Sequence, residues 1–84
     1  MPVTGAQVRM ARAALNWTVR DLAEATGLHR NTINNIEVGR YAGDPMTLEV
    51  MEKVLHQAGV EFIDENGGGP GVRLKKRKRE TRKK

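Results

Sequence analysis

Residues 18–39 decide the fold of this 84-residue chain, and they read Thr18-Val-Arg-Asp-Leu-Ala-Glu-Ala-Thr-Gly-Leu-His-Arg-Asn-Thr-Ile-Asn-Asn-Ile-Glu-Val-Gly39. The stretch holds two short helical patterns, from about Val19 to Ala25 and from about Arg30 to Val38. Gly27 lies between them, and glycine accepts the left-handed conformation that ends a helix. Ala23 is small enough for two helices to cross closely, and four larger apolar residues are spaced to point inward: Leu22, Leu28, Ile33 and Ile36. The pattern predicts a helix-turn-helix motif.

Further helix start signals flank this motif. Thr4 with Gln7 three residues later, and Thr18 with Asp21, have the spacing of capping boxes. The first helix is expected to end near Asn16. Asp44 before Pro45 predicts the start of a fourth helix, because proline at the first helical position loses no hydrogen bond. Its apolar stripe and neighbours are expected in the core: Met46, Leu48, Met51, Val54 and Leu55.

After Gly59 the hydrophobic period changes to about two. Val60–Ile63 and Val72–Leu74 are predicted to form a β-hairpin, which packs on the helices or pairs with a second subunit. From Lys75 the composition is too polar for a core. The sequence therefore predicts a mainly α fold: a compact bundle of four to five helices with a helix-turn-helix over residues 1–59, a short C-terminal β-hairpin over residues 60–74, and a disordered basic tail over residues 75–84.

Composition narrows the function. The formal net charge is +5, and residues 73–84 carry nine Lys and Arg residues against one Glu. Such a tail either binds a polyanion such as DNA or is a solvated tail. The chain has no cysteine and two histidines, so we expect no metal and no cofactor. No catalytic constellation is present, and we expect no enzyme. No apolar run is long enough for a membrane span and no signal peptide is recognisable, so we expect a cytoplasmic protein.

The outer face of the third predicted helix is rich in hydrogen-bonding side chains: Arg30, Asn31, Asn34 and Asn35. Arginine pairs with guanine O6 and N7, and asparagine pairs with adenine N6 and N7. The alternative is an ordinary polar helix face. Asparagine lowers helix propensity, however, and three within five residues favour a functional reason for their presence.

Residues 4–58 resemble the Cro/repressor-type (XRE-like) helix-turn-helix family, through the elements Leu22-Ala23, Gly27-Leu28, Thr32-Ile33 and Ile36-Glu37-Val38-Gly39. The resemblance implies that the third helix enters the major groove of double-stranded DNA. Arg30, Asn31 and Asn35 would then contact bases, and Asn34 bases or phosphate.

The resemblance also implies phosphate contacts from Thr18, Thr32 and Arg40. His29 stands where the family usually has a capping Ser or Thr, so it is either a phosphate contact or only a poor cap. Arg12 and Glu37 match a salt bridge recurrent in the family, which would orient the third helix; the alternative is two solvated charges. Val19 replaces a frequent Gln, which puts that family contact in doubt.

The prediction is a sequence-specific transcriptional regulator, most readily a repressor, that binds a pseudo-palindromic operator as a homodimer. Val60, Phe62 and Ile63 are the expected dimerisation residues. Two alternatives stay open. One is an antitoxin or controller protein that also binds a protein partner, such as a toxin, an antiactivator or a polymerase. The other is a non-specific nucleic-acid binder that acts through the basic tail.

Overall fold

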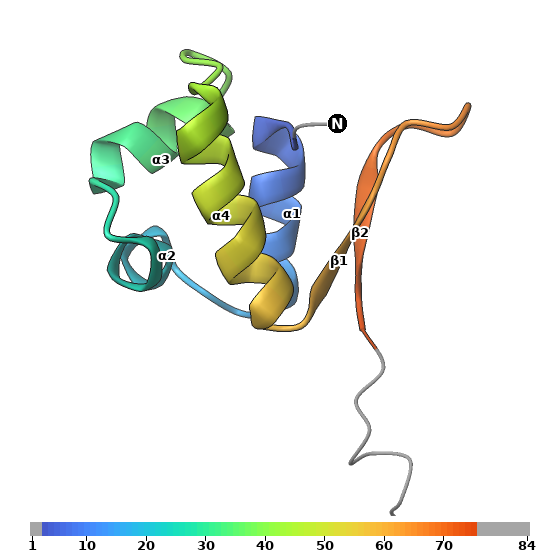
Figure 1. Cartoon of the computed structure of the whole chain (residues 1–84), viewed down its shortest axis with the longest axis horizontal. Helices are drawn as coiled ribbons and strands as arrows, with labels where there is room; N and C mark the ends of the chain where they lie inside the picture. The colour runs from blue at the N-terminus through green and yellow to red at the C-terminus, as the bar shows by residue number, and fades with distance from the viewer. Residues whose placement is uncertain (1–2, 76–84) are drawn as a thin grey trace, which may run out of the picture.

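Four helices followed by one β-hairpin form the part of the chain that the computed structural model describes, residues 3–75 (Figure 1). In chain order the elements are α1 (Gly5–Ala14), α2 (Val19–Thr26), α3 (Arg30–Glu37), α4 (Pro45–Gln57), β1 (Val60–Ile63) and β2 (Gly71–Leu74). The predicted mainly helical fold with a C-terminal hairpin is confirmed. Apart from Lys75, the predicted basic tail lies outside the described residues.

The predicted helix starts are present as hydrogen bonds. Thr4 and Thr18 each form a complete capping box, with Gln7 and Asp21 respectively. At α4, the Thr47 backbone N–H donates to the Asp44 side chain at 2.8 Å. Each cap satisfies backbone N–H groups that have no partner within the helix, which fixes where the helix begins.

One core joins all four helices to the hairpin. Its fully buried side chains come from every helix and from β1: Val8, Ala11, Leu22, Ile33, Met51, Leu55 and Val60. The expectation that Met46 belongs to this core is wrong, because its side chain is 75% exposed. Met46 precedes Leu48 by two residues, which is about 200° around a helix, so it faces solvent when Leu48 faces inward.

The hairpin packs on the helices of its own chain. β1 and β2 pair antiparallel, with Val60 opposite Leu74 and Phe62 opposite Val72. Directly opposed residues share one face of a sheet, and Val60, Phe62 and Val72 pack against the helical core. Figure 1 shows the two strands running beside α1 and α4. None of the helices in the described residues is long and apolar enough to cross a bilayer.

Gln7 fastens the hairpin to α1. Its amide nitrogen donates to the backbone oxygens of Ile63 at 3.1 Å and Gly71 at 3.0 Å, one from each strand. Its amide oxygen accepts the Thr4 backbone N–H at 3.0 Å. A single side chain, 3% exposed, therefore caps a helix and holds both strands of the sheet.

Candidate nucleic-acid interface

The turn between α2 and α3 is held by hydrogen bonds on both sides of a left-handed glycine. Gly27 has φ +79° and donates its N–H to the Ala23 carbonyl at 2.8 Å. The Thr26 hydroxyl donates to the Leu22 carbonyl at 2.7 Å and accepts the Leu28 N–H at 3.2 Å. These bonds fix the direction in which α3 leaves α2. Sequence reasoning found Gly27 but did not assign a role to Thr26.

The two sides of α3 differ sharply in burial. Ile33 and Ile36 are at most 2% exposed, whereas Arg30, Asn31 and Asn34 lie in solvent. Thr32 and Asn35 are half-buried at the edges of the exposed side. The structure therefore places the predicted base-contacting residues on one outward surface, which we call the α3 polar face: Arg30, Asn31, Asn34 and Asn35.

Arg12 and Glu37 connect the C-terminal end of α3 to α1. The Arg12 Nε and Nη2 groups donate to the two carboxylate oxygens of Glu37 at 2.8 and 2.9 Å, and Nη1 donates to the Trp17 carbonyl at 2.9 Å. The hydrogen bonds to Glu37 raise the Arg12 pKa above its ordinary value, against the opposing effect of burial. The Arg12 guanidinium thus links α1 to the segment before α2 and to the end of α3.

His29 serves as the N-cap of α3. Its Nδ1 accepts the Asn31 backbone N–H at 3.1 Å. An accepting Nδ1 carries a lone pair, so the proton of the neutral ring is on Nε2. Among residues 3–75 that N–H has no hydrogen-bond partner, so it can donate outward from the exposed side chain. Histidine therefore acts in place of the usual Ser or Thr cap and satisfies one N–H of the first turn of α3.

Asn35 and Arg40 are joined after the end of α3. The Arg40 Nη1 donates to the Asn35 amide oxygen at 3.0 Å, and the Arg40 backbone N–H donates to the Asn35 carbonyl at 2.9 Å. The same carbonyl accepts the Tyr41 N–H at 3.2 Å. This side-chain contact was not foreseen from the sequence, because nothing in the spacing of the two residues shows how the chain turns at Gly39.

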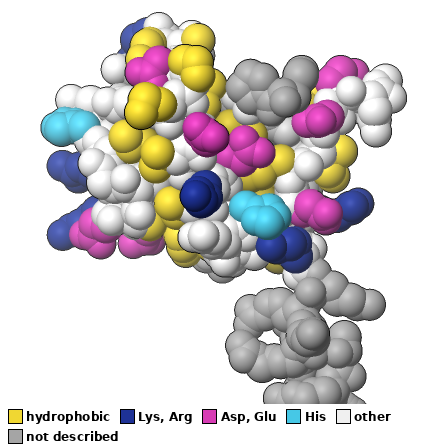
Figure 2. Space-filling model, viewed as in Figure 1, with side chains coloured by type: hydrophobic (Ala, Val, Ile, Leu, Met, Phe, Trp, Pro, Cys, Tyr) yellow, Lys and Arg dark blue, Asp and Glu magenta, His cyan; other side chains and the backbone are white. Residues whose placement is uncertain are grey.

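The starts of α2 and α3 share a surface hollow of about 540 Å³. Thr18 and His29, two of the predicted phosphate contacts, line it together with Arg30, Asn31 and Asn34. Figure 2 shows cationic and histidine side chains, with acidic side chains beside them, at the edge of the molecule where α2 and α3 lie in Figure 1. In the described residues no group of three His, Asp or Glu side chains could hold a metal ion.

The residues expected to mediate dimerisation lie in different environments. Val60 is fully buried in the core of its own chain. Phe62 is half-buried and packs on the same core, whereas Ile63 occupies the other face of β1, opposite Gly71. Of the three side chains, only Ile63 points away from the helices.

A family model described as "Helix-turn-helix" matches residues 8–61, from within α1 to the second residue of β1. The match covers the α2–turn–α3 unit, the Arg12–Glu37 pair and the Asn35–Arg40 pair. A comparison with curated proteins gives no match.

Proposed function

Because the chain belongs to the XRE-type helix-turn-helix family, and is therefore a DNA-binding transcription regulator, we propose that it is a sequence-specific repressor that binds a pseudo-palindromic operator as a homodimer. A repressor of this kind acts by occupying an operator that overlaps a promoter. The protein would then be cytoplasmic.

The observation that carries the proposal is the α3 polar face. Three amides and one guanidinium project from a helix whose other side is locked into the core, and an α-helix of this width fits the major groove of B-form DNA. Arg30, Asn31 and Asn35 contact base edges, and Asn34 contacts a base or a phosphate. Around them the phosphate contacts come from Thr18, His29, Thr32 and Arg40.

We propose a dimer because α3 alone is too short to contact a whole operator. One recognition helix reaches about half of a typical site, and two-fold dimers place two such helices about 34 Å apart, one turn of DNA. Ile63 and the open edges of the hairpin provide the surface for a second copy, because Val60 and Phe62 are occupied by their own core. Repression then depends on protein concentration and on the symmetry of the operator.

Selection of bound duplexes from a random pool tests the proposal directly. We expect a recovered motif with two-fold symmetry and half-sites centred about one helical turn apart. Replacement of Asn31 or Arg30 by Ala should cost about 1–3 kcal/mol on that duplex and relax preference at one base pair of each half-site. Lys53→Ala, on the exposed side of α4, is the matched control and should leave preference unchanged.

Two results would contradict the proposal. The first is a pool that shows no enrichment, with binding that disappears when the chain is cut after Leu74; the basic tail would then account for all DNA binding. The second is an equal loss on selected and random duplexes for Asn31→Ala, which would mean that Asn31 contacts only phosphate.

A further inference from the structure

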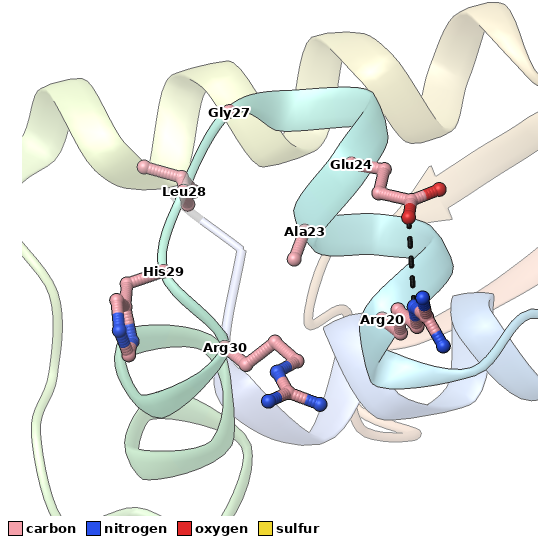
Figure 3. Close-up of a pocket in the computed structure, with 7 residues that line it drawn as sticks. All are labelled: Arg20, Ala23, Glu24, Gly27, Leu28, His29 and Arg30. Atoms are coloured by element: carbon pink, nitrogen blue, oxygen red, sulfur yellow. Dashed lines mark ion pairs between the residues drawn. The ribbon is translucent and has the colours of Figure 1, made fainter.

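Arg20 lies beside the α3 polar face but has no role in the function proposed above. It is the second residue of α2, and it lines two adjoining hollows, of about 440 and 540 Å³, between α2 and α3. Arg30 and His29 line both hollows as well. Figure 3 shows the Arg30 side chain extending from the start of α3 toward Arg20 on α2.

Charge at this place is incompletely compensated. Arg20 pairs with Glu24 one helical turn later, with 3.5 Å between Nε and Oε2 (Figure 3). Within residues 3–75, no carboxylate forms an ion pair with Arg30. Two guanidinium groups therefore border one open space, and Glu24 is the carboxylate that pairs with one of them, which leaves a net positive charge facing solvent.

The Arg20–Glu24 pair is easily exchanged for another partner. Its side chains are 74% and 70% exposed, and exposed ion pairs of this kind contribute little stability. A phosphodiester offers the guanidinium two oxygens in a geometry that matches its fork of N–H groups. An incoming phosphate can thus replace the carboxylate of Glu24 at little cost.

We propose that Arg20 binds a backbone phosphodiester of DNA in the hollow it shares with Arg30, and that Glu24 holds the Arg20 side chain in the free protein. This inference rests on the proposed function, because it needs α3 in the major groove. With Arg30 directed at a base, Arg20 on the neighbouring helix meets the sugar–phosphate wall of the same groove. Contacts of this kind set the register of the protein on DNA without reading sequence.

The first test compares Arg20→Ala with Lys53→Ala on the selected duplex and on random duplexes. Each phosphate contact contributes about 0.9 to the slope of log K against log salt. At 0.1 M salt, Arg20→Ala should weaken binding about five- to tenfold on both duplexes and lower the slope by about one. Lys53→Ala should change neither. Because Arg20 is exposed, thermal melts should show that both variants fold.

The second test locates the phosphate. Neutral methylphosphonate linkages are placed one at a time along the selected duplex. Some methylphosphonate positions should weaken binding of both the unmodified protein and Arg20→Ala. At one further position per half-site, the linkage should weaken binding of the unmodified protein but not of Arg20→Ala. Glu24→Gln should tighten binding about two- to threefold, because it releases Arg20 and removes a negative charge near the phosphate, and most of that gain should vanish in an Arg20→Ala background.

The outcomes separate the two proposals. If Arg20→Ala binds normally while Asn31→Ala loses preference, the Arg20 inference is wrong and the proposed function stands. A change in base preference with Arg20→Ala would make Arg20 a base contact and overturn the inference. If inorganic phosphate, titrated at constant ionic strength, competes with DNA in an Arg20-dependent manner at low millimolar concentration, the hollow is a small-anion site instead. Absence of any enriched duplex would remove the proposed function itself.

Discussion

Arg12 of α1 binds Glu37 at the end of α3 through two parallel hydrogen bonds, Nε–Oε2 at 2.8 Å and Nη2–Oε1 at 2.9 Å. The side chains are 20% and 3% exposed. Parallel bonds between the two planar groups fix the rotation of α3 as well as its distance from α1. We therefore expect the pair to orient the α3 polar face, which belongs to the same helix.

Breaking this pair from one side should be strongly destabilising. Arg12→Met leaves the nearly inaccessible Glu37 carboxylate without its cation, which costs about 3 kcal/mol in comparable buried pairs. The double variant Arg12→Met/Glu37→Met removes both charges and should recover most of that loss. Urea denaturation of the single and double variants measures both effects.

The double variant also separates stability from orientation. If the pair orients α3, the double variant should fold and yet bind the selected duplex with reduced preference over random DNA. A double variant with the original preference would show that packing alone positions α3. If Arg12→Met were as stable as the original protein, the Glu37 carboxylate would have to be hydrated in that variant.

Gln7 offers a test of how the hairpin is held. Gln7→Ala removes the donor shared by the Ile63 and Gly71 carbonyls, and we expect a loss of about 2 kcal/mol. Gln7→Glu keeps the acceptor for the Thr4 N–H but places a carboxylate against two carbonyl oxygens, so it should lose at least as much. Amide hydrogen exchange should accelerate in β1 and β2 more than in α2 and α3.

Exchange that accelerates uniformly over all elements would contradict this expectation, because it would mean that the hairpin opens only with the whole domain. Thr4→Ala is the matched control. It removes the other half of the same capping box but leaves the Gln7 amide nitrogen in place, so it should loosen the start of α1 without selective loss of hairpin protection.

Local signals explain how much of the fold could be predicted from the sequence. The caps at Thr4, Thr18 and Asp44 each depend on residues within three positions, and all three helices begin where these signals place them. The left-handed Gly27 follows from the same short-range chemistry. Two predicted helix ends, near Ala25 and Val38, differ by one residue from the observed ends, as expected where the last turn frays.

Of the contacts between distant residues, the Arg12–Glu37 pair is expected from the family resemblance, whereas the others could not be predicted. Gln7 meets Ile63 and Gly71 across 56 and 64 residues, and only the assembled bundle brings them together. Gly5 lies so close to α3 that a Cβ atom there would overlap the Ile36 carbonyl oxygen. A sequence pattern does not give the distance at which two helices cross, so it could not show that α1 needs a glycine here to approach α3. For the same reason Arg20 could not be placed beside Arg30 before the turn geometry was known.

Acid should destabilise the domain through two exposed carboxylates. The Thr47 backbone N–H, which donates to Asp44, lowers the Asp44 pKa below its ordinary 3.8, and the Arg73 side chain lowers the Glu61 pKa below its ordinary 4.5. A folded-state pKa below the unfolded value means that these carboxylates stabilise the fold above about pH 4.5. That stabilisation is lost as the pH falls through the lowered values.

Melting temperature should therefore be level from pH 7 to about 5 and fall below that. The Asp44→Asn/Glu61→Gln variant keeps acceptor oxygens at both positions but has no charge to neutralise there. Its melting temperature should be lower at pH 7 and should decline less steeply in acid. An acid decline as steep as that of the original protein would assign the effect to other carboxylates.

The contact between Asn35 and Arg40 leads us to predict that Arg40 affects base specificity. Arg40 donates to the same Asn35 amide oxygen that would accept adenine N6–H in a base contact. A carbonyl oxygen has two lone pairs, so it can accept both donors, and Arg40 then holds the amide plane at a fixed angle on the half-buried Asn35. Arg40 should thus affect base preference as well as phosphate binding.

Arg40→Ala should therefore weaken binding to all duplexes and, in addition, relax preference at the base pair that Asn35 contacts, by about 1 kcal/mol. Arg40→Lys keeps the charge but lacks the planar fork. It should restore most of the overall affinity and only part of the preference. The measurement is a double-mutant cycle: the affinities of Asn35→Ala, Arg40→Ala and the double variant are compared on duplexes altered at single base pairs. Arg20→Ala is the control, because it removes a cation but should leave base preference intact. Additive effects in the cycle would show that Arg40 binds phosphate independently of Asn35, whereas coupling confined to one base pair would identify the adenine that the pair reads together.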